Sequence, residues 1–384
     1  MRPGSPRINI RVFTAFLVVG LLMLTIASAF VLGIGAWRLR SAYGANLAKV
    51  ADQTAAAVDA YVFRRIIDAS ILARVPDIRD IAVAGNKLPF DAKAARDIDQ
   101  QWLMTREVPA ALKDLFFTRA SSFLGEVSQD DAVYRELFVT DRFGRLVAAS
   151  HKISNYYQAE EDWWKEAFGG GVRGRLVVSD VKWDESAKVF ALEIAVPITE
   201  STGGPLAGVL KVVADIRDIG TVVSGVRLGA SGEGHLLRED GSFVFSRGEV
   251  DPNARFFATD LLREHLQAVR KGEEMPAMSF AARGADGATR LVGLALSQLK
   301  ASYPNLAWVV AVSQGEDELF APVREQWGSL VIVLAFTALA VVLLALWLTV
   351  RMAARPPDSD LHLVEHARKL DEQDAEAGGG GAGG

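Results

Sequence analysis

Apolar residues dominate two neighbouring segments in the middle of the chain. Residues 190–198 and 206–216 are rich in aliphatic and β-branched side chains, and the turn between them holds Gly203, Gly204 and Pro205. Such side chains favour strands, whereas glycine and proline favour a chain reversal. The pattern predicts a β-hairpin. Because both arms are almost continuously apolar, we expect them to be central strands of an antiparallel sheet that is covered on both faces.

Two longer apolar runs flank this region. Residues 12–37 and residues 328–350 contain no ionisable side chain. Each run is long enough to cross the roughly 30 Å hydrocarbon core of a bilayer as a helix. The alternative for the first run is a cleaved signal peptide, but the apolar core of such a peptide is only about 7–15 residues long. We therefore predict two uncleaved transmembrane helices.

Basic residues give the expected orientation of these helices. They lie on both sides of the first run, so its flanks do not fix the direction of insertion. Arg351 and Arg355 follow the second run and favour a cytoplasmic C-terminus. We expect residues 1–11 and 351–384 in the cytoplasm and residues 38–327 outside, in a two-pass protein of the inner (cytoplasmic) membrane.

Apolar residues recur at mostly three- and four-residue spacing beyond the first run: Leu47, Val50, Ala51, Val58, Tyr61, Val62, Ile66 and Ile67. This spacing predicts a long amphipathic helix that ends near Pro76. Its apolar stripe has two candidate partners, the same stripe of a second copy in a homodimer or a sheet of its own chain. A second helical region is expected from Asp91 to about Phe123.

A strand, a turn with Asp and Gly, and a second strand occur twice along the chain. Residues 137–150 and residues 235–246 both have this form, which is typical of a tight hairpin. The central hairpin has a weaker counterpart in residues 290–313. The chain between the apolar runs is therefore expected to contain two repeated modules, each with two hairpins.

Four motifs stand in order between the apolar runs. They are the paired hairpins, residues 195–198, the glycine-rich residues 229–234 and residues 308–314. Over residues 38–350 this order resembles the bacterial double Cache sensor domains. The resemblance implies an α+β fold with a long N-terminal helix and two stacked PAS-like antiparallel-sheet modules, a distal one over about 80–218 and a proximal one over about 228–315. It also implies extracytoplasmic ligand sensing by a transmembrane receptor, and no enzymatic activity.

In double Cache domains the ligand usually lies in the distal module, between a helix-and-loop segment and the sheet. The resemblance places that segment at residues 155–168. The aromatic and acidic residues that we predict to line the ligand site are Tyr156, Tyr157, Glu161, Trp163, Trp164, Asp180, Trp183 and Asp184. Aromatic walls with carboxylates favour a small cation or amine. The alternative is that the tryptophans only pack a short helix against the sheet.

One position departs from the amino-acid-binding members of the family. Those members carry an arginine two residues before the first aromatic residue of the pair, where it holds the carboxylate of the ligand, and this chain has Glu161 there. A carboxylate at this place would repel an anionic ligand. We expect a neutral or cationic, amine-like ligand, with Trp164 and Tyr157 as walls and Asp180 or Asp184 as the polar anchor. The proximal module is expected to be a spacer.

Composition argues against several classes of function. The formal net charge of -5 and the pI near 5.7 give no basic field for nucleic acid. The chain has no cysteine, which removes disulfides, thiolate nucleophiles and cysteine metal sites. His362 and His366 fit the H-x-x-E-H pattern of some zinc peptidases, but they lie in a short charged tail that offers no further ligand. We expect a solvated helix there, no metal and no cofactor.

The function that these features favour is a membrane-bound small-molecule sensor. Residues 351–384 are too few for a kinase, cyclase or chemotaxis signalling domain, so we expect either a separate cytoplasmic signalling protein as partner or a truncated gene product. One alternative is an adaptor that binds another protein or cell-wall material without a small ligand. The other is a hydrolase in which folding brings His151 or His235 beside a serine.

Overall fold

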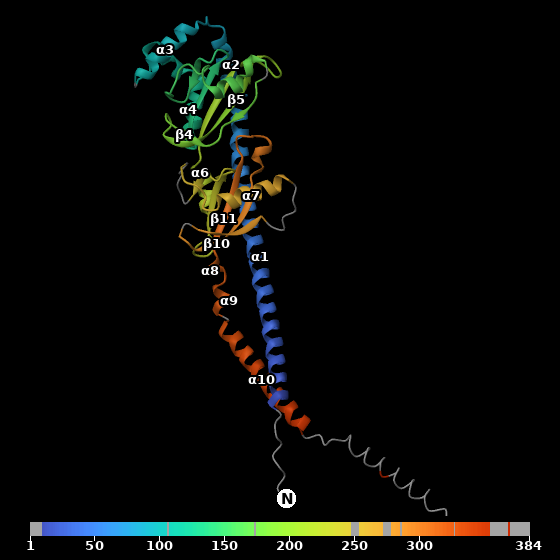
Figure 1. Ribbon diagram of the computed structural model, residues 1–384. Coiled ribbons are helices and arrows are strands. Elements are labelled where there is room, and N and C mark those ends of the chain that lie inside the picture. The colour runs from blue at the N-terminus through green and yellow to red at the C-terminus, as the bar shows by residue number, and fades with distance from the viewer. Residues whose placement is uncertain are drawn as a thin grey trace, which may run out of the picture. The chain divides into compact units, whose positions relative to one another are not determined.

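The computed structural model describes residues 10–105, 107–172, 174–246, 253–271, 278–284, 286–325, 327–353 and 368. The chain forms two compact units, Met1–Leu39 with Phe320–Gly384 and Arg40–Leu319. Helix α1 (Ile10–Leu72) begins in the first of these and continues into the second (Figure 1). The H-x-x-E-H motif at His362 and His366 lies outside the described residues.

The unit with both chain ends contains the first part of α1 together with α9 (Ala321–Glu325) and α10 (Trp327–Ala353). Two stretches, Phe13–Leu72 and Val331–Arg351, are long and apolar enough to cross a membrane. Their most apolar windows are only 0% and 6% buried. A helix of a soluble core would bury such side chains, whereas lipid accepts them on every side. The structure therefore has a candidate span in each predicted run.

Within the unit Arg40–Leu319, α1 is the amphipathic helix that the sequence predicts. Leu47, Val58 and Ile66 are each at most 4% exposed, so the main apolar stripe is covered by the chain's own modules. The helix ends at Leu72, and Pro76 opens α2 (Pro76–Asn86). Proline is tolerated at this first position because its missing N–H would have no intrahelical partner there.

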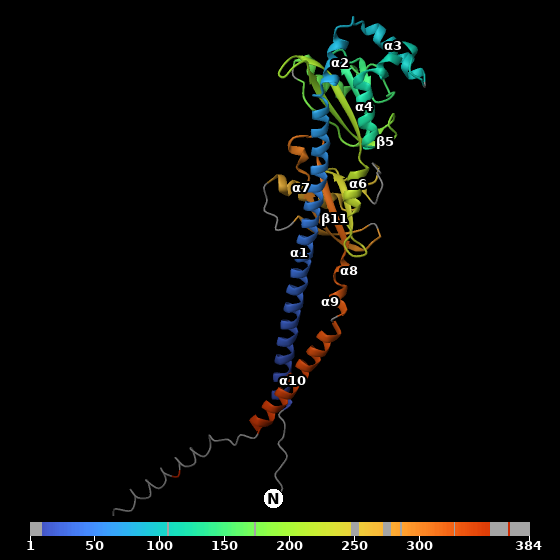
Figure 2. The same cartoon turned by 180° about the vertical axis from the view of Figure 1, so that it is seen from behind.

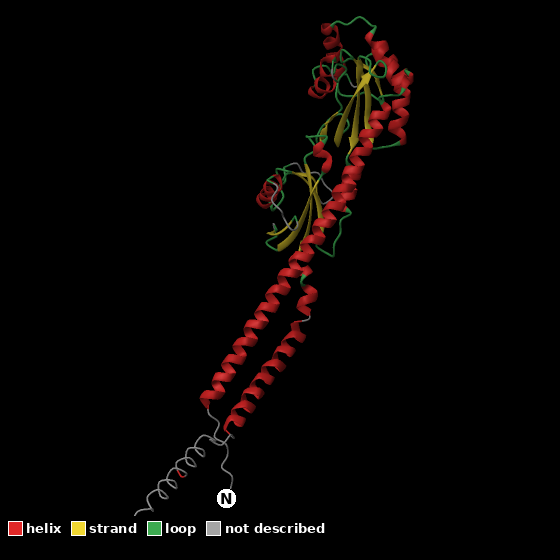
Figure 3. Cartoon of the chain, turned by 90° about the vertical axis from the view of Figure 1, so that its right-hand side faces the viewer, coloured by secondary structure: helices red, strands yellow, loops and turns green. Residues whose placement is uncertain are grey.

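A six-stranded antiparallel sheet forms the first module. Its strands are β1 (Tyr134–Asp141), β2 (Leu146–Ala149), β3 (Val177–Val178), β4 (Lys182–Asp184), β5 (Val189–Thr199) and β6 (Leu206–Asp215). Their order is β2-β1-β6-β5-β3, with β4 also paired to β5. Strands are drawn in yellow in Figure 3. The predicted central hairpin is β5–β6. Both of its strands are buried along most of their length, which explains the continuous apolar pattern.

Helices cover both faces of this sheet. Besides α2 they are α3 (Ala92–Met104), η1 (Ala110–Phe117), α4 (Arg119–Asp130), α5 (Asp162–Phe168) and η2 (Gly169–Gly171). On β1, Thr140 contacts Trp164 of α5, whereas Asp141 lies beside Gly85 of α2. Successive strand residues point to opposite faces, so α5 and α2 lie on opposite sides of the sheet.

The second module has a five-stranded antiparallel sheet. Its elements are α6 (Arg217–Ser224), β7 (Glu233–Arg238), β8 (Phe243–Ser246), α7 (Thr259–Arg270), β9 (Ser279–Arg283), β10 (Thr289–Leu296), η3 (Gln298–Ala301), β11 (Trp308–Gly315) and α8 (Glu316–Leu319). The strand order is β8-β7-β11-β10-β9. Leu262 and Leu266 of α7 pack with Leu237, Val292 and Val309 of the sheet as its core.

The two modules repeat one topology. Hairpin β1–β2 corresponds to β7–β8, and β5–β6 corresponds to β10–β11, in the same positions of the strand order. Gly144 and Gly241 stand at equivalent turns with φ of 82° and 83°, a left-handed conformation that glycine adopts without strain. The predicted repeat and the α+β class are confirmed.

Helix α1 passes along both modules of this unit (Figure 2). At Gly293 of β10 the strand approaches the helix so closely that a Cβ would lie 2.2 Å from the backbone nitrogen of Ala48. About three turns further along α1, the buried carboxylate of Asp59 accepts a hydrogen bond of 2.6 Å from Ser297 Oγ. Glycine at position 293 is therefore required by packing, and α1 is fixed to the second module at two points.

Candidate functional site

Three ionisable side chains are buried inside the first sheet. Glu136 on β1, Glu193 on β5 and Lys211 on β6 have exposed fractions of 2%, 4% and 8%, and we call them the charge cluster. Glu136 and Glu193 both lie opposite Val213, and Lys211 lies opposite Phe138, so all three point to the sheet face that carries α5. Burial of charge is costly, and clusters of this kind gather at functional sites.

Glu193 is balanced by a lysine on each side. Its carboxylate is 3.0 Å from Lys182 Nζ on β4 and 3.3 Å from Lys211 Nζ. Ser179 Oγ lies 3.3 Å from the same carboxylate. Lys182 is exposed and Lys211 is buried. Glu193 therefore forms one ion pair at the surface of the module and one in its interior. The charge of Glu193 is therefore satisfied by the protein itself.

Aromatic rings close over Lys211. Its Nζ lies 4.6 Å from the ring centroid of Trp163 on α5 and 5.8 Å from that of Phe138. The two rings meet edge to face at 5.9 Å. A cation above aromatic rings is stabilised by their negative faces. Trp163 therefore forms a wall of the charge cluster, which is the arrangement of aromatic and charged groups that suits a small polar ligand.

The carboxylate of Glu136 has a different environment. Its Oε1 is buried and has no hydrogen-bond partner among the described residues. His151 Nε2 lies 3.9 Å away, beyond hydrogen-bonding distance, and His151 Nδ1 is 3.1 Å from Ser150 Oγ. Buried acceptors are nearly always paired in folded proteins. Glu136 therefore presents an acceptor that the described part of the chain does not satisfy.

The electrostatic environment of Glu136 favours its neutral form. Burial raises the pKa of this carboxyl to about 7, and the negative charges of Asp184 and Glu193 act in the same direction. The Ser186 hydroxyl and Lys211 act the other way but are weaker than burial. The pKa of His151 is lowered by burial, so this imidazole is neutral at pH 7. Glu136 therefore titrates near neutral pH.

The predicted tyrosines belong to a neighbouring apolar core. Tyr156 and Tyr157 are 7% and 9% exposed and pack in one cluster with Trp102 and Phe138. The backbone nitrogens of both tyrosines donate to Asp99 Oδ1, at 2.7 and 3.0 Å. Trp163 packs against the same apolar cluster, so the two tyrosines belong to the core beside the wall of the charge cluster.

The two neighbouring tryptophans have different surroundings. Trp164 is buried, stacks on Phe168 at 4.7 Å and donates through Nε1 to Thr140 Oγ1 at 2.9 Å. This is the packing arrangement that the sequence left open as the alternative. Trp163 is only half-buried and faces Lys211. The structure thus places Trp163, and not Trp164, at the charge cluster.

Asp180 lies at the junction between the modules. Its carboxylate accepts hydrogen bonds from Arg238 Nε and, at 2.9 Å, from Trp308 Nε1, both in the second module. Arg238 also donates to the carbonyl of Val181 at 2.9 Å. The structure therefore gives Asp180 a role in joining the modules, and its predicted role as polar anchor of a ligand stays a prediction.

The remaining predicted residues are spread around the edge of the sheet. Glu161 is exposed and precedes α5, and Trp183 is 43% exposed with its ring against Phe190. Asp184 Oδ1 accepts from the nitrogen and the hydroxyl of Ser186, at 2.9 and 2.8 Å, and so closes the β4–β5 turn. Of these residues only Asp184 acts on the cluster, through its effect on Glu136.

Sequence reasoning did not single out Glu136, Glu193 and Lys211 as site residues. A signal was present, because Glu193 and Lys211 each interrupt an apolar strand with one ionisable residue. Such an interruption in a strand buried on both faces marks a charge inside the module. Glu136 gives a weaker signal, since it follows Arg135 near the start of β1.

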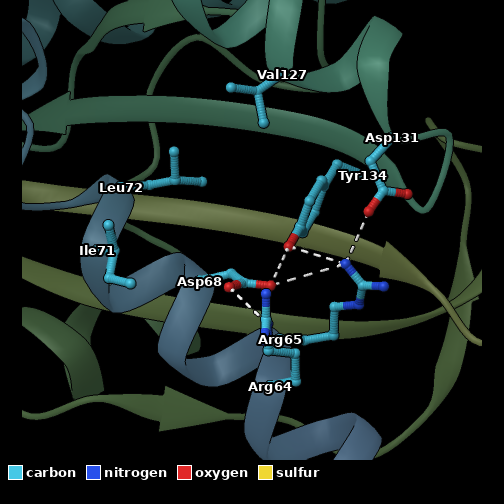
Figure 4. Close-up of a pocket in the computed structure, with 8 residues that line it drawn as sticks. All are labelled: Arg64, Arg65, Asp68, Ile71, Leu72, Val127, Asp131 and Tyr134. Atoms are coloured by element: carbon cyan, nitrogen blue, oxygen red, sulfur yellow. Dashed lines mark hydrogen bonds and ion pairs between the residues drawn. The ribbon is translucent and has the colours of Figure 1, made fainter.

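A pocket of about 490 Å³ lies on the first module, beside the C-terminal end of α1. Figure 4 shows the residues that line it: Arg64, Arg65, Asp68, Ile71, Leu72, Val127, Asp131 and Tyr134. Arg65 pairs with Asp131 at 2.8 Å and donates to the Tyr134 hydroxyl at 3.1 Å. That hydroxyl donates to Asp68 at 3.1 Å. These contacts link α1 to β1, whereas the buried Nε of Arg65 has no hydrogen-bond partner among the described residues.

Two histidines contact serine hydroxyls, as the hydrolase alternative requires. Ser150, His151 and Glu136 are arranged in sequence, but the imidazole-to-carboxylate distance of 3.9 Å is too long for the hydrogen bond that orients a catalytic histidine. His235 Nδ1 is 2.9 Å from Ser246 Oγ, yet the ring is 4% exposed beneath Phe243 and Phe256. The geometry of neither pair fits a nucleophile and its base.

Comparison with known proteins finds likenesses in three dimensions only. No protein-family model matches the sequence, and no curated protein matches it. The sensory domain of the Campylobacter jejuni chemoreceptor Tlp3 with isoleucine bound is 14% identical, with a TM-score of 0.47, over 73% of this chain and 96% of that one.

Two Pseudomonas aeruginosa chemoreceptor ligand-binding domains also match. That of PctB in complex with L-Arg is 14% identical, with a TM-score of 0.43, over 85% of this chain and 98% of its own. That of PctC in complex with GABA is 15% identical, with a TM-score of 0.43, over 70% and 97%. All three are sensory or ligand-binding domains of chemoreceptors.

Proposed function

We propose that the chain is an extracytoplasmic small-molecule sensor, in which the first module binds the ligand and the binding is transmitted across the membrane. The charge cluster of Glu136, Glu193 and Lys211 is the observation that carries this proposal. It combines buried ionisable groups, an unsatisfied acceptor and the aromatic wall of Trp163 on one sheet face. A module that served only as a scaffold would be more stable with apolar residues in these places.

The expected ligand is small and neutral or cationic. Glu193 is already paired with Lys182 and Lys211, so the lysines do not offer a free charge to an anion. Asp184 adds negative charge on the same side, and Glu136 adds more when it is ionised. Isoleucine, arginine and GABA, the ligands of the similar domains, all carry an ammonium group and supply a starting panel of compounds.

A route for transmission runs through the segment between β3 and β4. Ser179 and Lys182 contact Glu193 of the charge cluster, and Asp180 between them contacts Arg238 and Trp308 of the second module. A ligand that moves Glu193 therefore displaces a segment that is bonded to both modules. The second module is in turn fixed to α1, which continues toward the predicted first span.

Residues 12–37 and 328–350 are proposed as the two spans of an inner-membrane protein, with residues 38–327 outside. A homodimer is proposed through the exposed side of α1, where Ile67 and Ile71 are 55% and 59% exposed one helical turn apart. A separate cytoplasmic signalling protein is proposed as the recipient of the signal.

Thermal unfolding of the full chain in nanodiscs tests the sensor proposal. The panel contains the three amino compounds, simple amines, carboxylates and neutral sugars. A ligand at a hundredfold excess over its Kd stabilises the folded state by about 2.7 kcal/mol, which raises the melting temperature. An adaptor, the alternative function, would show no shift with any small molecule and would instead be stabilised by a protein or cell-wall fraction.

A further inference from the structure

Glu136 is the one member of the charge cluster with an open acceptor. Its side chain is 3% exposed, and its Oε1 has no hydrogen-bond partner in the part of the chain that the structure describes. By contrast, both carboxylate oxygens of Glu193 lie within 3.3 Å of a lysine. An ionised carboxylate that is buried without a hydrogen-bond partner loses its bound water and gains no protein contact in exchange, which costs free energy. The site is therefore incomplete as it stands.

The titratable groups that face Glu136 come from β4, β5, β6 and the chain just after β2, and none pairs with its Oε1. The Ser186 hydroxyl also acts on this carboxyl, but it lies 2.8 Å from Asp184 Oδ1 and leaves Glu136 Oε1 without a partner. His151 follows β2, is neutral at pH 7 and lies 3.9 Å away. Asp184 at the end of β4 is negative and is occupied by its own turn. Glu193 on β5 is negative, and Lys211 on β6 is held at 3.3 Å from it. What the site lacks is one positive charge and one N–H donor.

We propose that Glu136 determines ligand specificity, because its Oε1 accepts a hydrogen bond from a protonated amine of the ligand, so that amine binding requires this carboxyl to be ionised. The inference rests on the proposed sensor function and names the ligand class, a small organic ammonium compound. The alkyl part of such a ligand would lie against Trp163 and Phe138, whose rings attract both apolar groups and cations.

Two other cation classes fit the site less well. Metal ions require several convergent oxygen or nitrogen ligands, and the described residues contain no group of three that could hold one. A guanidinium carries several N–H donors in one plane and needs more acceptors than a single open Oε1. A primary ammonium is a compact point charge with three N–H donors; one donor can reach Glu136 Oε1, and the faces of the neighbouring rings can stabilise the rest of its charge. The expected ligand is therefore an alkylamine or an amino compound.

The proposed contact makes binding depend on pH in one direction. An alkylamine stays protonated well above neutral pH, because its pKa is near 10. Glu136 has a pKa raised by burial to about 7, so below that pH a proton must leave the carboxyl before an ammonium binds. Protonation of His151 at low pH would add a positive charge nearby and oppose the ligand further. Affinity should therefore fall as the pH is lowered.

Calorimetric titration of the full chain in nanodiscs tests this inference. The probes are n-butylamine, 1,4-diaminobutane and GABA, with butyrate as the matched compound without an amine. We expect at least one amine to bind at pH 8 and butyrate not to bind. Affinity for that amine should fall about tenfold per pH unit below pH 6. Glu136→Gln should weaken binding at pH 8 by at least tenfold and remove the pH dependence. Glu126→Gln, at an exposed position of α4, is the control.

The outcomes separate this inference from the sensor proposal. If the chain binds butyrate or a neutral compound but no amine, the ammonium inference is wrong and the sensor proposal stands. If no small molecule of the wider panel binds, both are wrong. An amine that binds Glu136→Gln as tightly as the wild type, with the same pH profile, would overturn the role of Glu136. The wild-type pH profile tests the inference independently if the variant does not fold.

Discussion

At the scale of single residues, the energetic cost of the buried carboxyl is open to direct measurement. Glu136 has a pKa of about 7 in the folded chain, against an ordinary value of 4.5. Between these two pH values the folded state binds more protons than the unfolded state, so stability falls as the pH rises through this window. A shift of this size corresponds to roughly 3 kcal/mol. The folded chain carries this cost at neutral pH when Glu136 has no cationic partner.

Glu136→Gln should therefore stabilise the ligand-free chain in a pH-dependent way. Glutamine keeps the shape of the side chain and removes the charge. We expect the melting temperature of the variant to exceed that of the wild type at pH 8, and the difference to shrink toward pH 5. Melting curves at several pH values, with Glu126→Gln as the control, measure the effect. A difference that is the same at pH 5 and pH 8 would contradict the assigned titration.

The neighbouring tryptophans should separate stability from binding. Trp164→Ala removes a buried ring and leaves Thr140 Oγ1 without its indole donor, so it should destabilise the chain by about 3–5 kcal/mol. Trp163 is half-buried, so Trp163→Ala should cost clearly less stability while weakening binding of the amine probe. Denaturant unfolding and calorimetry of both variants give the comparison. If Trp164→Ala alone lost binding, with normal stability, the two roles would be reversed.

These residues also show what sequence could and could not give for the site. The density of aromatic residues near Trp163 drew attention to a segment that lies against the sheet beside the charge cluster, because bulky rings on a short helix pack on a sheet. Which ring faces the charges depends on the orientation of α5, and the sequence does not contain that. Glu136 and Lys211 are 75 positions apart in the sequence numbering and meet only through the pairing of β1 with β6.

At the scale of elements, the segment between β3 and β4 has two sets of partners. Through Ser179 and Lys182 it contacts Glu193. Through Asp180 it contacts Arg238 and Trp308 of the second module. Its strands are only two and three residues long, so few ladder hydrogen bonds resist its displacement. Such a segment is suited to move with the ligand and to pull on the second module.

Asp180→Asn should uncouple the modules without removing the ligand site. The change takes the charge from Arg238 and should cost about 1–3 kcal/mol of stability. We expect affinity for the amine probe to change little. Hydrogen exchange should then show ligand-induced protection in β5 and β6 but no longer in β11. Lys188→Gln, in the exposed β4–β5 turn, is a control that should leave protection in β11 intact. Loss of binding in Asp180→Asn would instead place Asp180 in the site.

Elements were more predictable than their partners. The central hairpin and both Asp and Gly turns follow from local rules, and Gly144 and Gly241 adopt the left-handed conformation that such turns require. The sequence predicted the apolar stripe on α1 but left two candidate partners for it, a second copy of the helix and the chain's own modules. The structure settles this for Leu47 and Ile66, which are buried by the chain itself. A periodic pattern records that a face is covered and not what covers it.

At the scale of the whole molecule, the order of elements connects sensing to the membrane. One helix, α1, contains both a candidate span and the contacts to the second module. The second candidate span follows β11 after only two short helices, α8 and α9. A change in the second sheet therefore has a short covalent path to the second candidate span, and the contacts of this module with α1 connect it to the first. The proposed signalling role requires that these spans place the two ends of the chain in the cytoplasm and the modules outside.

Reporter fusions test this topology. Arg351 and Arg355 follow the second apolar run, and cytoplasmic flanks are enriched in such residues. A reporter that works only in the cytoplasm should therefore be active when fused after Arg355 and inactive when inserted near Gly248. A reporter that works only outside the cytoplasm should give the reverse pattern at the same two sites, which controls for expression. Replacing both arginines with glutamate should reduce the preference for this orientation. Cytoplasmic activity at the Gly248 site in the unaltered chain would place the charge cluster inside the cell, and the proposed extracytoplasmic sensor would then be wrong.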